Sequence, residues 1–345
     1  MEGSVVMAGL SPHPPIIVPD VGQGEEQKAS STVAAMDALG KQFAESDIDT
    51  LVVVTPHGPA FSDAVSISGL KTFEGDFLSF GSRVGVSLTN DLELAKAIAK
   101  VGADNPIQTV LLDKVNLGRY GIGSGLDHGT LVPLFYFKKH GFNKPVVIIN
   151  IGFLPYFDLY LFGSFIERCA FRLGRRIGVL ASGDLSHRLS KDSPAGFNPK
   201  GQLFDKSLME KLAAFSASDI LLMSPTLIED AGECGLRPVS IMLGALDKAA
   251  VEAKVLSYEG PFGVGYGVAS FKPMGWDEAN SRIGMITGSR KARMKQIRRN
   301  ESYPVALARK TVEKLLSGGD AKGLTDETPG EFYKQAGVFV SIHKE

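Results

Sequence analysis

The stretch Val179-Leu-Ala-Ser-Gly-Asp-Leu-Ser-His187 joins an apolar run to a loop of polar side chains. The apolar part has the composition of a buried strand, and Gly183 breaks it. Asp184, Ser186 and His187 follow on the loop. In open α/β sheets, ligands bind outside the carboxyl ends of the strands. The stretch therefore predicts a sheet with a reactive histidine at its carboxyl edge.

Two more histidines follow apolar runs in the same way. Residues 4–10 form a short apolar run that ends at the proline-rich loop of His13, and residues 51–55 form another that ends just before His57. A helix is expected over residues 24–45, where apolar side chains recur at three- and four-residue spacing. A strand, a helix and a strand in this order indicate a parallel crossover unit. We therefore expect His13, His57 and His187 to share one site.

The rest of the chain alternates between helical and strand patterns up to Pro273. A glycine-rich stretch at residues 118–129 holds Tyr120, Asp127 and His128, and Tyr120 and Phe262 are candidate aromatic walls of a pocket. Asn90 is the expected N-cap of one helix. Further helices are expected at residues 90–101, 131–137, 156–173, 201–215 and 238–249, and further strands at residues 146–151, 177–181, 251–258 and 264–271.

Beyond Pro273 the composition changes. Residues 289–299 are strongly basic and are typical of an exposed helix or a solvated linker rather than a nucleic-acid patch. A short amphipathic helix is expected at residues 303–316 and a strand at residues 337–343. A helix and one strand cannot bury a core by themselves, so this tail is expected to pack on the main domain or to begin another.

Length, charge and cysteine content exclude several classes of protein. With 345 residues, of which 44% are hydrophobic, the chain is expected to form one large domain with an appendage, or two domains. The formal net charge of −1 gives no drive toward nucleic acid or an anionic membrane. Two cysteines make no disulfide framework, which favours a reducing, cytoplasmic setting. The sequence shows no signal peptide and no apolar run of the roughly 20 residues that span a membrane.

A shared site of several imidazoles indicates a metal. Two histidines and one carboxylate, with open positions opposite, suit Fe(II) that binds a substrate and O₂ together, and zinc accepts the same ligands. The best candidate for the carboxylate is Glu233, which lies between two glycines just before a predicted helix. Its neighbour Cys234 offers a thiolate, which suits softer metals, so both residues remain candidates. His140 is expected to be a cation at the end of a helix, and His343 has no assigned role.

Five segments together resemble the class III extradiol ring-cleavage dioxygenase family. This family includes the catalytic LigB-type subunit of protocatechuate 4,5-dioxygenase and the related Memo proteins, and the resemblance covers residues 1–273. Each motif alone is weak, and their common order makes the resemblance strong. The segments are Ser11-Pro-His-Pro-Pro-Ile16, Thr55-Pro-His-Gly58, Asp127-His-Gly-Thr-Leu-Val-Pro-Leu134, Ser182-Gly-Asp-Leu-Ser-His187 and Gly232-Glu-Cys-Gly-Leu-Arg237.

The resemblance implies a fold and a set of residue roles. The fold would be an α/β/α sandwich of three layers around a mixed, largely parallel sheet. The family's iron ligands match His13, His57 and Glu233, with Cys234 as the alternative to Glu233 because Memo-like relatives carry a cysteine there. The family's acid/base in the second sphere matches His187, and a histidine near the substrate matches His128. Asp184 and Ser186 are expected to orient His187 through hydrogen bonds.

The predicted activity is that of a non-haem Fe(II) extradiol dioxygenase that cleaves a catechol-like substrate with O₂, with zinc or copper as alternative metals. A second hypothesis is a Memo-like metal or redox protein that works with AMMECR and radical-SAM partners and cleaves no catechol. A zinc hydrolase-like site ranks lowest, because no nucleophile elbow or further carboxylate cluster is visible. The expected ligands are a small aromatic diol and O₂, and the large apolar fraction is compatible with self-association.

The resemblance also divides the chain. Residues 1–273 correspond to the dioxygenase-like domain, and residues 274–300 are expected to form a basic linker. Residues 301–345 are similar to the opening of an AMMECR domain, of which only the beginning is present.

Overall fold

The computed structural model describes residues 4–320 and 329–330 and contains two compact units, Met1–Ile283 and Gly284–Glu345. The boundary between these units falls inside the range expected to be a linker. The strand expected at residues 337–343, and with it His343, lies outside the described residues. No described helix is both long enough and apolar enough to cross a membrane.

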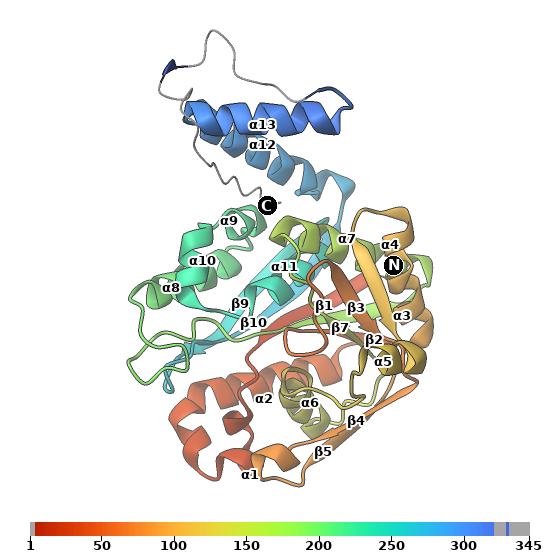
Figure 1. Ribbon diagram of the computed structural model, residues 1–345. Coiled ribbons are helices and arrows are strands. Elements are labelled where there is room, and N and C mark those ends of the chain that lie inside the picture. The colour runs from red at the N-terminus through yellow and green to blue at the C-terminus, as the bar shows by residue number, and fades with distance from the viewer. Residues whose placement is uncertain (1–3, 321–328, 331–345) are drawn as a thin grey trace. The chain divides into compact units, whose positions relative to one another are not determined.

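The first unit is built on an eight-stranded sheet with the order β6-β3-β7-β2-β8-β1-β10-β9 (Figure 1). The four central strands β1, β2, β7 and β8 run parallel, whereas β10 is antiparallel to β1 and β3 is antiparallel to β7. The sheet is therefore mixed and largely parallel, as predicted. The strands are β1 (Ser4–Ser11), β2 (Thr50–Thr55), β3 (Ala64–Ser68), β6 (Gln108–Leu112), β7 (Val146–Asn150), β8 (Arg176–Ser182), β9 (Ala249–Glu259) and β10 (Tyr266–Trp276).

Continuous apolar runs explain the burial of the central strands. Every residue of β2 and β7 is buried, because a parallel sheet covered on both faces needs apolar side chains on both. The helix α2 (Ser30–Glu45) connects β1 to β2, and both strands pair in parallel with β8, which lies between them. Leu10 and Val54 are both in register with Ala181. The carboxyl ends of β1, β2 and β8 therefore meet at one edge of the sheet.

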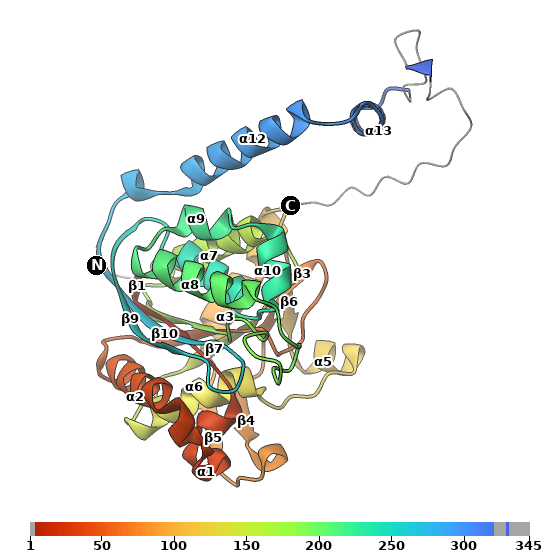
Figure 2. The same cartoon turned by 90° about the vertical axis from the view of Figure 1, so that its left-hand side faces the viewer.

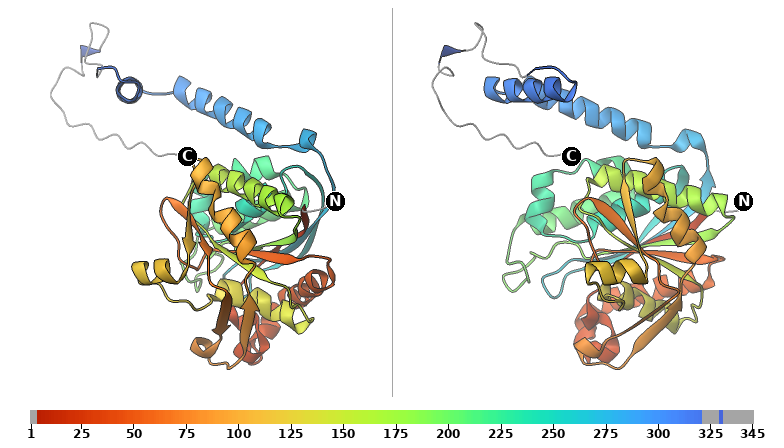
Figure 3. Two further views of the ribbon diagram at one scale, coloured as in Figure 1. Left: turned by 90° about the vertical axis from the view of Figure 1, so that its right-hand side faces the viewer. Right: turned by 45° about the vertical axis from the view of Figure 1, so that its right-hand side comes forward.

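Helices cover both faces of the sheet, which confirms the three-layer α/β/α architecture. The helices α2 and α6 (His128–Lys139) lie on one face, and α7 (Tyr156–Arg172) and α11 (Leu236–Ala245) lie on the other (Figures 2 and 3). The remaining helices of this unit are α1 (Pro19–Gly22), α3 (Leu92–Ala99), α4 (Val101–Asp104), α5 (Lys114–Tyr120), α8 (Lys200–Ala213), α9 (Ala217–Leu221) and α10 (Pro225–Ala231), with 3₁₀ turns at Pro15–Ile17, Glu25–Ala29, Leu78–Phe80 and Glu278–Asn280.

A small hairpin of β4 (Thr72–Asp76) and β5 (Gly85–Thr89) extends from this core and was not expected from the sequence. Its alternating side chains Phe73, Val86 and Leu88 are buried in the hydrophobic cluster that also contains residues of α6. The hairpin brings the exposed Phe80 of its connecting turn to a ring distance of 6.0 Å from His128.

The prediction of Asn90 as an N-cap is wrong. The cap of α3 is its neighbour Asp91, whose carboxylate accepts a hydrogen bond from the Leu94 N–H at 3.1 Å. The amide of Asn90 donates instead to the carbonyl oxygens of Ser68 and Leu70, at 2.9 and 2.8 Å. A cap must accept from the helix, whereas this side chain donates to the chain at and just after the end of β3.

The helix α12 (Ile283–Arg299) begins at the last residue of the first unit, and the rest of it belongs to the second unit. The second unit also contains α13 (Tyr303–Leu316). The basic run is thus an exposed helix, since Ile286 is the only buried residue described in α12. Arg309 makes ion pairs with Glu301 and Glu313, and Glu313 also pairs with Arg298. These pairs neutralise part of the charge of the tail.

Candidate metal centre

The loops after β1 and β2 bring two imidazoles into direct contact. His13 is 1% exposed and lies just beyond β1, whereas His57 is exposed and lies just beyond β2. Their Nε2 atoms are 2.8 Å apart, and their rings are nearly perpendicular at 81°. The pairing follows from the parallel strands, which end at the same edge of the sheet.

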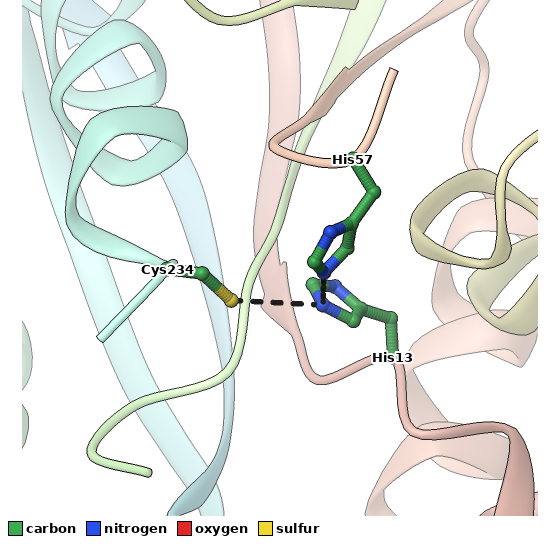
Figure 4. Close-up of side chains that lie close together, drawn as sticks. All are labelled: His13, His57 and Cys234. Carbon is green, nitrogen blue, oxygen red and sulfur yellow. Dashed lines mark hydrogen bonds between the residues drawn. The ribbon is translucent and has the colours of Figure 1, made fainter. Parts of the chain in front are cut away.

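A cysteine completes the group. Cys234 lies in the turn between α10 and α11, and its Sγ is 3.6 Å from the Nε2 of His13 (Figure 4). The ligand atoms of His13, His57 and Cys234 all lie within 4.8 Å of one another. Figure 4 shows the two rings and the sulfur converging from three separate segments of chain.

The His13–His57 and His13–Cys234 separations are compatible with one shared metal ion. Imidazole nitrogens about 2.0–2.1 Å from an ion lie roughly 2.9 Å apart when their bonds meet at a right angle. A thiolate at about 2.3 Å and an imidazole at about 2.0 Å are roughly 3.5 Å apart at a tetrahedral angle. The observed separations of 2.8 and 3.6 Å match these values. Two imidazoles and a thiolate accept zinc, copper or iron.

Glu233, the leading candidate for the third ligand in the sequence, is engaged elsewhere. Its Oε2 accepts a hydrogen bond from the N–H of Leu236, the first residue of α11, at 2.5 Å. Burial raises the pKa of this carboxyl to about 7. The structure therefore brings the alternative, Cys234, into the group with the two histidines, while the identity of the third ligand remains a prediction.

Asp184 forms its hydrogen bond with His13 rather than with the ring of His187. Its Oδ1 accepts a hydrogen bond from the backbone N–H of His13 at 2.9 Å, and its Oδ2 is 3.9 Å from the Nε2 of the same residue. Burial raises the pKa of Asp184 to about 7. Ser186, the other residue expected to orient His187, donates its hydroxyl to the carbonyl of Ala231 at 2.9 Å. The expected hydrogen bonds from these two residues to the His187 ring are therefore replaced by contacts that the sequence does not reveal.

The ring of His187 is held by a backbone carbonyl. Its Nδ1 lies 2.7 Å from the carbonyl oxygen of Gly232, which adopts a left-handed conformation at φ +61°. A carbonyl oxygen only accepts hydrogen bonds, so Nδ1 carries the proton and Nε2 keeps its lone pair. Burial also lowers the pKa of this imidazole. His187 is therefore neutral and able to take up a proton through Nε2.

His128 completes a group of four histidines. It is the first residue of α6, where Asp127 caps the helix, and its ring centroid lies 4.2 Å from that of His57 and 5.4 Å from that of His13. Burial, reinforced by repulsion from neighbouring imidazoles, lowers the pKa of His13 far below its usual value and that of His57 to about 4. The imidazoles are thus neutral, which is the form that binds metals.

A cavity of about 710 Å³ adjoins the cluster. His57, Asp127 and Asn150 line it together with Phe61 and Tyr120, whose rings meet edge to face at 5.3 Å. Tyr120 is thus an aromatic wall, as expected, whereas the other candidate, Phe262, packs toward Tyr266. A cavity of this size accommodates a small aromatic molecule.

Sequence reasoning missed Asn150, which is 2% exposed at the carboxyl end of β7. A Cβ on Gly58 would lie 1.7 Å from its Oδ1, so the turn after His57 packs directly on this side chain. The available signal was a polar residue that ends an apolar run, the same pattern that identified the histidines. His140, in contrast, is the C-cap of α6, as its expected place at a helix end implies, and its Nε2 lies 3.1 Å from a carboxylate oxygen of Asp37.

Comparison with known proteins gives the family. A model described as the catalytic LigB subunit of aromatic ring-opening dioxygenase matches residues 7–269. Protein CA_C1420 of Clostridium acetobutylicum is 34% identical over 338 residues, which cover 97% of this chain and 72% of that protein. The crystal structure of the uncharacterized protein JW3007 from Escherichia coli K12 shares the fold, with a TM-score of 0.52 and 16% identity over 77% of this chain and 99% of that chain.

The family match ends before the second unit, so the AMMECR-like character of residues 301–345 stays a prediction. The match spans all five motifs that carry the resemblance, including both histidine loops and the turn of Cys234. This chain belongs to the family of the catalytic LigB subunit of aromatic ring-opening dioxygenases.

Proposed function

We propose that the protein is a metal-dependent dioxygenase that opens the ring of a catechol-like substrate with O₂. The observation that carries this proposal is the convergence of His13, His57 and Cys234 beside a cavity lined by His57, in a chain of the LigB family. The proposed metal is iron, held by these three residues. When bound, such an ion would hold the diol oxygens and O₂ in contact and pass charge between them.

The chain's own residues supply the proton chemistry. The Nε2 of His187 is unprotonated because Nδ1 donates to Gly232, so His187 is suited to take the proton of a substrate hydroxyl. The charged imidazole then returns a proton when the ring opens. His128 lies against His57, and its proposed role is to contact a substrate ring bound beside that residue. Asp184 holds the backbone of His13 in position.

Metal analysis and oxygen uptake test the proposal. Protein purified without oxygen and loaded with Fe(II) is expected to consume O₂ with simple catechols and to form a ring-opened product. Cys234→Ser should lower the iron content and abolish uptake, because it removes one of the three ligands. Cys169→Ser provides the matched control, since Cys169 is the other free cysteine and lies in α7. Equal losses in both variants, or full iron content in Cys234→Ser, would contradict the assignment.

The thiolate favours a second candidate. A site of two imidazoles and one thiolate also suits copper or zinc, and it supports a metal–thiolate redox protein that cleaves no catechol. Its proposed partners are AMMECR and radical-SAM proteins. Bound metal without oxygen uptake across a broad panel of diols would favour this candidate over the first.

A further inference from the structure

The first turn of α6, Asp127–Thr130, receives hydrogen bonds from two strand ends of the sheet. The hydroxyl of Ser182, the last residue of β8, donates to the carbonyl oxygen of Gly129 at 2.5 Å. The hydroxyl of Thr55, the last residue of β2, donates to Oδ1 of Asp127 at 2.6 Å. Each of these hydroxyl groups also contacts a histidine loop, so the turn is linked to both imidazoles of the metal centre.

The link to His13 determines where its proton lies. Ser182 has one hydroxyl proton, and the carbonyl of Gly129 can only accept it. The Oγ of Ser182 must therefore accept from Nδ1 of His13, which lies 2.9 Å away. His13 and Ser182 are 1% and 0% exposed, so water does not compete for these bonds. The Nε2 of His13 is left with its lone pair toward His57 and Cys234.

The link to His57 acts on its backbone. The Oγ1 of Thr55 accepts a hydrogen bond from the N–H of His57 at 3.3 Å, while the same hydroxyl donates to Asp127. Asp127 also accepts from the hydroxyl of Thr130 at 3.0 Å, which fixes the carboxylate against the helix. The position of the His57 loop thus depends on the capping residue of α6.

The approach of this turn to β2 requires a glycine. A Cβ on Gly129 would lie 2.5 Å from Oγ1 of Thr55, 2.7 Å from Oδ1 of Asp127 and 3.5 Å from a ring carbon of His57. Any larger residue would push the turn away from Thr55 and from the ring. Close packing therefore requires glycine at position 129, and the carbonyl oxygen of Gly129 also accepts the hydrogen bond from Ser182.

We propose that the turn Asp127–Thr130 is a positioning element of the metal centre. It selects the Nδ1–H tautomer of His13 through Ser182 and fixes the loop of His57 through Thr55. The inference rests on the proposed metal site for its purpose, but the tautomer is a property of the metal-free protein. Ser182 and Thr55 are positioning residues, since each acts through a histidine.

Nitrogen NMR of the metal-free protein, with labelled histidine, tests the tautomer directly. The wild-type spectrum is expected to show a protonated Nδ1 and an unprotonated Nε2 for His13. Ser182→Ala should give a mixture of tautomers and weaken binding of Zn²⁺, used as the probe metal, by about 10–100-fold. Ser182→Thr keeps the hydroxyl and should restore the wild-type tautomer.

The matched control is Ser164→Ala. Ser164 is also buried, at 4% exposure, and donates to a backbone carbonyl, that of Leu161, at 2.7 Å within α7. This variant should change neither tautomer nor metal affinity. A protonated Nε2 on His13 in the wild-type protein overturns the inference without any variant. Failure of the wild-type protein to bind metal, with the Nδ1–H tautomer present, would instead overturn the proposed function alone.

Discussion

Asp205 offers a sharp test of how burial controls the region around His187. Its side chain is 0% exposed, and Oδ1 accepts a hydrogen bond from the N–H of Ser186 at 2.8 Å, while Oδ2 accepts one from the hydroxyl of Tyr258 at 2.8 Å. Burial raises the pKa of this carboxyl from 3.8 to about 6, against the opposing effect of the two hydrogen bonds. Asp205 thus anchors the loop of His187 with a carboxyl that resists ionisation.

The sign of the effect follows from proton binding. Between pH 3.8 and about 6 the folded state keeps the proton of Asp205, whereas the unfolded chain releases it. The contribution of this carboxyl to the free energy of unfolding therefore falls as the pH rises through that window. At roughly 1.4 kcal/mol per pKa unit, the full change is on the order of 3 kcal/mol.

Asp205→Asn removes this titration and keeps groups that can bond to Ser186 and Tyr258. Urea unfolding at a series of pH values should show the variant gaining stability relative to the wild type by up to about 3 kcal/mol between pH 4 and pH 7. The exposed Asp192, changed to asparagine, is the control and should show no such trend. A difference between variant and wild type that stays constant with pH, or that reverses sign, would refute the reasoning.

Three further predictions concern the centre itself. Glu233→Ala should keep the metal but destabilise the fold by about 1 kcal/mol, because Glu233 accepts a hydrogen bond from the first N–H of α11, and metal content with thermal unfolding checks this. His187→Ala should retain metal and lower kcat by about 10²–10⁴-fold, and an emptied site would make His187 a ligand. The midpoint of the fall in kcat/KM at acidic pH should lie below pH 6.5, because burial lowers the pKa of His187. A pH–rate profile measures this midpoint.

Much of the framework of the site is legible in the sequence. The apolar runs that become β1, β2 and β8 are each followed by a histidine, and parallel strands necessarily end at one edge. Helix periodicity also predicts α13 with the bounds that the structure gives it. These features are local or depend on a single topological rule, so they need no knowledge of distant contacts.

The short strands β3 and β6 escape prediction for a physical reason. Residues 64–68 and 108–112 mix polar and apolar side chains, and β3 gains its partners only when it pairs with β6 and β7. Strand preference depends on cross-strand neighbours more than on intrinsic tendency. The hairpin of β4 and β5 escapes prediction for the same reason, because its apolar face finds a packing partner only in the assembled core.

The sequence by itself determined which kinds of side chain stand at the carboxyl edge of the sheet, because the apolar runs and the polar loops that follow them are visible in the chain. Only the tertiary structure decided what these side chains touch. Glu233 and Cys234 are adjacent in the chain, yet the first bonds to the start of α11 and the second points toward His13. Asp184 reaches the backbone of a residue that is 171 positions away. Such choices depend on the direction of each side chain in the packed fold, which sequence spacing does not encode.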